Sequence, residues 1–296
     1  EVLLQQSHAR FPDLPRVGFA LAEYGMATHT EKMVQQGMES VLAVMDTIQE
    51  ATQEELCSEL CFEFFVWYKV RFAFIGTPLN PRLEEGLQRC HALFPENGDV
   101  LRAISQVQLD QRQWERAKAT LLKAKAVVEE GRAAKEVLLQ LAYVYDKTDQ
   151  VDQVETLLRE AIAQYPDDAQ VYNFLGYTYA DRNIKLEEAQ SLIEKACQLN
   201  PNDGNIVDSL GWLYYRQGRY KEAIEQLERA NQLEEDHPVI LDHLGDALLK
   251  DGRIEDAVAS WKKSLECGPD FPTEFTPEFQ RQVSSKIKEA EKLNQP

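Results

Sequence analysis

Positive charge is scarce in this 296-residue chain, which has 32 Lys and Arg residues against 50 Asp and Glu residues and a formal net charge of -18. The basic residues form no block anywhere along the sequence. Because binding to a phosphate backbone requires a concentrated positive surface, this composition argues against a nucleic-acid-binding protein. An acidic surface instead favours partners that are cationic or apolar.

Motifs of catalytic and metal sites are also missing. The five His residues are scattered, and the sequence contains no HExxH segment, no GxSxG segment and no glycine-rich phosphate loop. Each of these motifs has the spacing that its chemistry requires, so their absence removes the common hydrolase, zinc and nucleotide sites. We therefore predict that the chain is not an enzyme and has no catalytic residues, no metal and no cofactor.

Cysteine is infrequent, and its spacing forms no disulfide framework. Cys57 and Cys61 lie four residues apart on a predicted helix, while Cys90, Cys197 and Cys267 are dispersed. A disulfide within one helical turn would be strained, and an odd cysteine count does not indicate a set of disulfides. We interpret the cysteines as small buried hydrophobic residues rather than redox or metal groups. Free cysteines favour a reducing compartment.

Long apolar runs are absent as well. No segment has the roughly 20 consecutive apolar residues that a membrane-spanning helix requires. The chain opens with Glu1 in the middle of a helical pattern, which indicates that a preceding segment has been removed. A signal or lipid-attachment sequence is one kind of segment that processing removes from this position.

What the sequence does contain is a repeat of 34 residues between Asp203 and Leu265. The residues that match at this offset are Leu210 and Leu244, Gly211 and Gly245, Gly218 and Gly252, Tyr220 and Ile254, Ala223 and Ala257, and Leu227 and Trp261. The pattern predicts two helices per copy, with small residues such as Gly211 and Ala223 where the helix axes approach most closely. Gly218 suits a turn that needs a positive φ. One pair cannot bury its apolar seam alone, so a stack is expected.

These residues resemble the tetratricopeptide repeat, most strongly between Lys135 and Leu265. The resemblance implies an all-α fold, a right-handed superhelical α-solenoid of stacked antiparallel helix pairs. We expect degenerate helix pairs over residues 1–97, five repeats over 98–268 and a capping helix within 269–296, near Pro277–Leu293. The five repeats are predicted to start near Gly98, Lys135, Ala169, Gly204 and Pro238.

The N-terminal segment is predicted to contain helices near residues 16–26, 30–48, 53–74 and 80–93. The third helix carries the densest aromatic cluster of the chain, CFEFFVWYKVRFAF, at residues 61–74. Because apolar residues surround most of this helix, we expect neighbouring helices to cover it. The alternative is a contact surface for a second copy or another partner. The residues of that surface would be Phe64, Phe65, Tyr68 and Phe72.

An aromatic residue recurs at the ninth position of three consecutive repeats, at Tyr143, Tyr177 and Trp212. By resemblance to the family, the first helix of each repeat forms a concave wall that holds partner segments, and this position faces it. Aromatic rings give contact area with few rotors to freeze, and polar neighbours bond a peptide. The candidate partner-binding residues are Tyr143, Asn173, Tyr177, Asp208, Trp212, Tyr215, Asp242 and Asp246. The alternative is that these rings pack against neighbouring helices.

The family's clamp for a terminal carboxylate, made of Lys, Asn and Arg side chains, is not matched at the fifth and ninth positions. Because an acidic wall repels a free carboxylate, we expect an internal, basic or apolar polypeptide segment as ligand. The last two repeats also resemble those of long bacterial envelope proteins, some of them lipoproteins that act as scaffolds or protease adaptors. That resemblance implies a non-enzymatic periplasmic adaptor with a lipid anchor, with the cytoplasm as the alternative location. A self-assembling scaffold and the regulatory arm of a truncated enzyme are the alternative functions.

Overall fold

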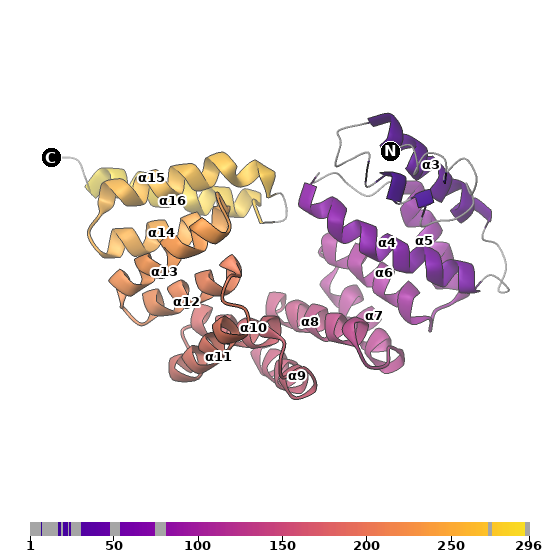
Figure 1. The fold of residues 1–296 in the computed structure, drawn as a ribbon, viewed down its shortest axis with the longest axis horizontal. Helices are drawn as coiled ribbons and strands as arrows, with labels where there is room; N and C mark the ends of the chain where they lie inside the picture. The colour runs from indigo at the N-terminus through magenta and orange to yellow at the C-terminus, as the bar shows by residue number, and fades with distance from the viewer. Residues whose placement is uncertain are drawn as a thin grey trace. The chain divides into compact units, whose positions relative to one another are not determined.

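The computed structural model describes residues 7, 17–18, 20–22, 24, 31–47, 54–74, 81–271 and 274–293. Within these ranges every regular element is a helix and no residue lies in a strand, which confirms the all-α prediction. The chain forms two compact units, an N-terminal unit of residues 1–151 and a C-terminal unit of residues 152–296 (Figure 1). No helix in the described part of the chain has the length and hydropathy that crossing a bilayer requires.

Consecutive helices pack as antiparallel pairs through most of the C-terminal unit, whereas in the early part of the N-terminal unit a helix also packs on the next but one along the chain (Figure 1). In the N-terminal unit the helices are α3 (Glu31–Thr47), α4 (Glu54–Phe74), α5 (Pro81–Leu93), α6 (Gly98–Asp110), α7 (Trp114–Val127) and α8 (Arg132–Lys147). From the boundary onward they are α9 (Val151–Gln164), α10 (Ala169–Asp181), α11 (Leu186–Leu199), α12 (Gly204–Arg216), α13 (Tyr220–Leu233), α14 (Pro238–Lys250), α15 (Ile254–Cys267), the short 3₁₀ helix η2 (Gly268–Asp270) and α16 (Pro277–Leu293). The grouping of these helices into three segments of the chain stays a prediction.

Local sequence signals explain where the first helices of the C-terminal repeats begin. The Asp203 carboxylate accepts hydrogen bonds from the backbone N–H groups of Asn205 and Ile206, at 3.1 and 3.3 Å, and so caps α12. Asp168 caps α10 in the same way, and Pro238 occupies the first turn of α14. Such residues satisfy or remove N–H groups that would otherwise lack partners, which fixes the first residue of each helix.

The turns inside the helix pairs use left-handed backbone conformations. Gly218 and Gly252 have φ angles of 76° and 87°, as the sequence predicted for Gly218. At the equivalent turns of earlier pairs, Asp149 and Asn183 adopt φ angles of 57° and 56°. Asn and Asp tolerate this region better than other residues with side chains, so these turns keep their shape without glycine.

Small residues hold the two helices of each pair close together, as predicted. A Cβ atom on Gly211 would lie 2.6 Å from Cγ of Leu227, and one on Gly176 would lie 2.6 Å from Cγ1 of Ile193. At the equivalent Gly245, the added atom would collide with the indole of Trp261. These contacts fix the spacing of the pairs and therefore the positions of the residues on the first helices.

Among the predicted contact residues in the aromatic cluster of α4, Phe64 is the one whose side chain the structure describes. Neighbouring helices cover it. Phe64 is fully buried in a core that includes Leu60 of α4, Leu87 of α5 and Ile104 of α6. The expectation that Phe64 contributes to self-association is therefore wrong, because packing within the unit already uses its ring. The side chains of the other predicted contact residues, Phe65, Tyr68 and Phe72, lie outside the described residues.

Candidate partner-binding surface

The candidate surface in the C-terminal unit is the side of α10, α12 and α14 that carries the fifth and ninth repeat positions, here termed the first-helix wall. Helix α12 contacts both α10 and α14, so these helices place the positions side by side. The predicted residues on this wall are Asn173, Tyr177, Asp208, Trp212, Tyr215, Asp242 and Asp246.

The part of the wall on α10 is partly open. Asn173 and Tyr177 are both half-buried, so each presents some surface to solvent. The side-chain oxygen of Asn173 is shielded and has no hydrogen-bond partner. Because a shielded polar atom without a partner costs free energy, it indicates a place where an added donor would stabilise the protein.

Trp212 of α12 is closed on both ring faces. Its indole stacks on Tyr215, with ring centroids 4.7 Å apart and planes inclined by 13°, and on His243 of α14, at 4.2 Å and 18°. Only 8% of the residue is exposed. The expectation that Trp212 offers an open ring face is therefore wrong, because its own neighbours fill both sides. The alternative reading, in which the ring packs against a neighbouring helix, describes this residue.

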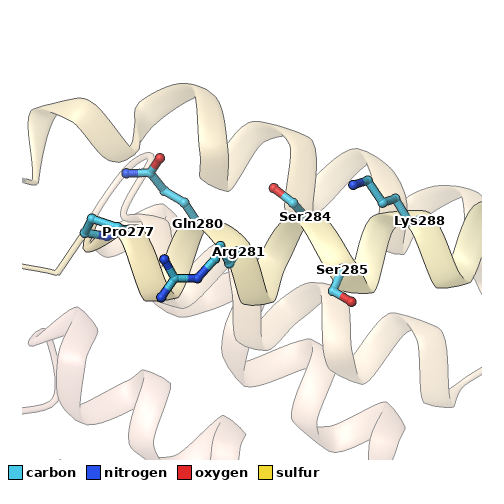
Figure 2. A pocket seen from close by; sticks show the side chains of 6 residues that line it. All are labelled: Pro277, Gln280, Arg281, Ser284, Ser285 and Lys288. Carbon is cyan, nitrogen blue, oxygen red and sulfur yellow. The ribbon is translucent and has the colours of Figure 1, made fainter.

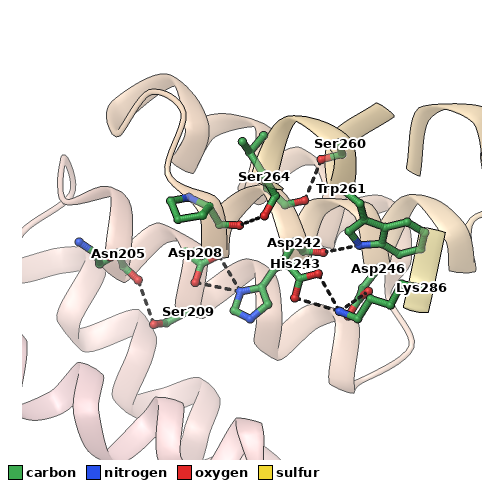
Figure 3. A network of polar contacts seen from close by, with 12 residues as sticks. Asn205, Asp208, Ser209, Asp242, His243, Asp246, Ser260, Trp261, Ser264 and Lys286 are labelled. Atoms are coloured by element: carbon green, nitrogen blue, oxygen red, sulfur yellow. Dashed lines mark hydrogen bonds and ion pairs between the residues drawn. The ribbon is translucent and has the colours of Figure 1, made fainter. Parts of the chain in front are cut away.

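Asp208 is also withdrawn from the surface, because it pairs with His243. Nδ1 of His243 lies 2.9 and 3.1 Å from the two carboxylate oxygens of Asp208, and both side chains are buried (Figure 3). Burial lowers the pKa of His243, but the charge of Asp208 and the hydrogen bond outweigh it, so the pKa lies above its ordinary value. The pair therefore favours an imidazolium beneath the Trp212 ring.

This pair predicts a pH dependence of stability. A histidine whose pKa rises on folding adds stability that is complete below its unfolded pKa of about 6.5 and is lost as the pH rises through the folded pKa. We expect the unfolding free energy of the wild type to fall over this range and that of His243→Gln to change less. Urea denaturation followed by far-UV circular dichroism at a series of pH values measures both. Identical slopes in the two proteins would contradict the assignment.

Asp242 and Asp246 are held by a lysine from the last helix. Nζ of Lys286 on α16 lies 2.8 and 2.9 Å from the two carboxylate oxygens of Asp242 and 2.8 Å from a carboxylate oxygen of Asp246 (Figure 3). The prediction that these carboxylates face an incoming ligand is therefore corrected: an internal ammonium group already bridges them. Burial and the neighbouring Asp242 raise the pKa of Asp246.

Two residues that shape this site, His243 and Lys286, were missed by sequence reasoning. His243 occupies the sixth position of its repeat, next to the fifth and ninth positions on which the prediction concentrated. Lys286 follows an irregular connection and contacts residues 40 and 44 positions earlier, not 34. The repeat period therefore carried no signal for it. The only available sign was a lysine near the apolar residues of an amphipathic helix.

Tyr143 belongs to the N-terminal unit and is the most open of the predicted rings, with 40% of the residue exposed. Its ring meets the ring of Trp114 edge to face at a centroid distance of 6.1 Å. Nζ of Lys147 lies 5.1 Å from the centre of the Tyr143 ring. These contacts orient the ring and leave part of it accessible, as a binding residue requires.

The three serine hydroxyl groups shown near the Asp208–His243 pair are engaged by backbone carbonyls. The hydroxyl groups of Ser209, Ser260 and Ser264 donate to the backbone carbonyls of Asn205, Leu241 and Pro238 (Figure 3). A catalytic triad needs a nucleophile hydrogen-bonded to the histidine, whereas these three hydroxyl groups bond backbone carbonyls instead. Among the described residues, no group of His, Cys, Asp and Glu side chains is arranged to hold a metal ion.

An open pocket of about 600 Å³ lies along one side of α16 (Figure 2). Within the described part of the chain its lining is Pro277, Gln280, Arg281, Ser284, Ser285 and Lys288. All six residues come from one helix, so no second element supplies the converging groups that enclose a small molecule. We assign no ligand to this pocket.

Two family models match the part of the chain that contains these helix pairs. The model for the tetratricopeptide repeat matches residues 135–178, and the model for anaphase-promoting complex, cyclosome, subunit 3 matches residues 182–264. The chain contains tetratricopeptide repeats. The TPR assignment agrees with the stacked antiparallel pairs and with the glycines at their close approaches. No curated protein matches this chain in sequence.

Solved structures show the same fold. TTC0263, a thermophilic TPR protein of Thermus thermophilus, is 22% identical with a TM-score of 0.54, over 62% of this chain and 96% of that chain. Yeast Tom70 is 15% identical with a TM-score of 0.55, over 96% of this chain and 64% of that chain. At these identities the similarity establishes a TPR fold for this protein and nothing about its partner.

Proposed function

We propose that this TPR protein is a non-enzymatic adaptor or scaffold that binds an extended segment of a partner polypeptide along its first helices. The observation that supports this proposal is a pair of shielded polar atoms without hydrogen-bond partners on adjacent first helices. They are the side-chain oxygen of Asn173 on α10 and Nε1 of Trp212 on α12. One is an acceptor and the other a donor, and a peptide backbone supplies the complement of both.

The rings beside these atoms supply contact area for such a segment. Tyr177 and Tyr215 are half-buried, and Tyr215 lies against Trp212 and at 5.8 Å from the ring of Tyr220. A ring already supported by its neighbours loses little conformational entropy when a ligand covers it. We therefore assign the anchoring role to Tyr177 and Tyr215, and Trp212 supports the ring of Tyr215.

The charge of the wall favours a basic or apolar segment. Two carboxylates, those of Asp242 and Asp246, share the single ammonium group of Lys286, which leaves this cluster negative. A ligand cation near the cluster would be attracted, whereas a terminal carboxylate would be repelled. As part of the same proposal, the resemblance of the last two repeats to envelope TPR proteins favours an adaptor located in a bacterial envelope.

Replacing Tyr177 with alanine is expected to weaken binding of a selected peptide by about 2 kcal/mol, or about 30-fold in Kd, because a central aromatic anchor is lost. The peptide would come from selection of a random linear-peptide library on the wild-type protein. Fluorescence anisotropy with the labelled peptide then measures Kd for wild type and variant.

Tyr172→Ala is the matched control, because this half-buried tyrosine lies on the same helix but about 140° around its axis from Tyr177. The control is expected to bind the peptide as the wild type does. Equal Kd values for all three proteins would refute a binding role for the wall, as would a library selection in which no sequence is enriched.

A further inference from the structure

Three thiols meet inside the N-terminal unit, away from the first-helix wall. Cys57 and Cys61 lie one turn apart on α4, and Cys90 lies on α5. All three are 0% exposed. Sγ of Cys57 is 2.7 Å from Sγ of Cys90, well inside the distance at which two non-bonded sulfur atoms normally rest. The sequence correctly indicated burial but gave no sign that Cys90, 33 residues away, joins the other two.

The hydrogen bonds around Cys90 favour its thiolate form over those of Cys57 and Cys61. A hydrogen bond from Cys61 lowers the pKa of the Cys90 thiol most, and a second one from Cys57 and the charge of Arg89 lower it further against the effect of burial. Burial raises the pKa of Cys57, and the hydrogen bond to Cys90 raises the pKa of Cys61. A lowered pKa increases the thiolate fraction, and the thiolate is the species that attacks a disulfide.

We propose that Cys57 and Cys90 are a disulfide-forming pair that covalently ties α4 to α5 when the protein meets a disulfide oxidant. The Cys90 thiolate attacks one sulfur of a small-molecule disulfide, forming a mixed disulfide and releasing one small thiolate. The Cys57 sulfur then attacks the Cys90 sulfur, forming the protein disulfide and releasing the second thiolate. The two protein thiols lose two protons and two electrons, and the oxidant becomes two small-molecule thiols.

Geometry favours this pair over a bridge between Cys57 and Cys61. Cys57 and Cys61 lie on one helix, where a bridge within a turn would be strained, whereas Cys57 and Cys90 face each other from two helices. The three thiols are not arranged to hold a metal ion. Because they are buried, the oxidant reaches them through local opening of the α4–α5 pair, so the bond forms slowly and then resists reduction in the closed state.

Peptide mapping of the full-length chain tests the proposal. The purified protein is equilibrated with oxidised and reduced glutathione, alkylated and digested without reduction by a protease that cleaves after Glu. Cleavage after Glu59 separates Cys57, in fragment 56–59, from Cys61, in fragment 60–63, while Cys90 falls in fragment 86–96. We expect fragments 56–59 and 86–96 to be joined. Finding Cys90 joined to fragment 60–63, carrying glutathione or alkylated would overturn the proposal.

Two variants distinguish a specific disulfide between Cys57 and Cys90 from general oxidation of cysteines. Cys57→Ser is expected to abolish the joined fragments, and Cys61→Ser is expected to leave their yield unchanged. Cys197 and Cys267 in the C-terminal unit are half-buried and serve as internal references, which we expect to be alkylated or to carry glutathione. Equal loss of the joined fragments in both variants would also overturn the proposal. The peptide map of the wild-type protein remains a test of the proposal even if a variant fails to fold.

Discussion

Replacing Trp261 with alanine is expected to lower the unfolding free energy of the C-terminal unit by about 3–5 kcal/mol. Trp261 is 1% exposed and among the largest fully buried side chains described. Its indole fills the space beside Gly245 and packs in one cluster with residues of α13, α14, α15 and α16. Its Nε1 donates a hydrogen bond of 3.2 Å to the backbone carbonyl of Asp242. The variant therefore removes the largest side chain from a core that α15 shares with three other helices, and it leaves a cavity.

Urea denaturation followed by circular dichroism measures the loss, and hydrogen exchange assigns it to α13–α16. Trp114→Ala is the matched control, because Trp114 is a half-buried tryptophan of the N-terminal unit. Its removal should cost less and should leave exchange in the C-terminal unit unchanged. Equal losses of unfolding free energy in the two variants would contradict the prediction that the burial of Trp261 sets the size of its effect.

Replacing Lys286 with methionine is expected to cost about 3 kcal/mol at neutral pH, because it leaves two poorly exposed carboxylates without their cation. The side chains of Asp242 and Asp246 are only 13% and 14% exposed, so water compensates them poorly. Burial lowers the pKa of Lys286, but the two carboxylates outweigh it, and the pKa lies above its ordinary value. Methionine keeps the apolar stem and removes the charge, so the loss reports electrostatics rather than packing.

The cost of Lys286→Met should diminish in mild acid. Burial and Asp242 raise the pKa of Asp246 while Lys286 lowers it, so removing Lys286 raises this pKa further. A carboxyl group whose pKa rises on folding adds stability at low pH that disappears as the pH rises through the folded pKa. We therefore expect the difference between variant and wild type to shrink between about pH 7 and the unfolded Asp pKa of about 3.9. Urea denaturation at several pH values measures it.

Lys262→Met is the control for the same chemical change at an exposed pair. Lys262 lies 2.8 Å from Glu291, but the two side chains are 58% and 49% exposed. Exposed ion pairs contribute about 0–1 kcal/mol, so this variant should stay close to the wild type at every pH. A loss as large as that of Lys286→Met would refute the distinction between the two sites.

The repeat period predicted the starts of the helices well, because helix starts and turns depend on residues that are close together in the sequence. Helices α10, α12 and α14 begin at Ala169, Gly204 and Pro238, the residues at which the sequence placed the corresponding repeats. Turn residues, capping residues and small residues at close approaches each leave a local signal, and a period of 34 residues repeats that signal. The all-α fold of paired helices follows from these signals alone.

The side-chain partners on the wall could not be predicted in the same way. Trp212 is covered by His243, and Asp242 is bridged by Lys286, and both partners come from other helices. A period identifies equivalent positions, but it does not say which side chain from a neighbouring element reaches them. The contact between Cys57 and Cys90 was missed for the same reason, since it joins side chains of two helices in the degenerate N-terminal segment.

The stack of His243 on Trp212 also gives the protein an intrinsic optical reporter. An imidazolium ring in contact with an indole quenches its emission, whereas a neutral imidazole quenches it much less. Because the two rings lie 4.2 Å apart, we expect the emission of Trp212, one of four tryptophans in the chain, to change with the protonation state of His243. A ligand that binds against Tyr215, the other neighbour of the indole, would change the same emission without an attached dye.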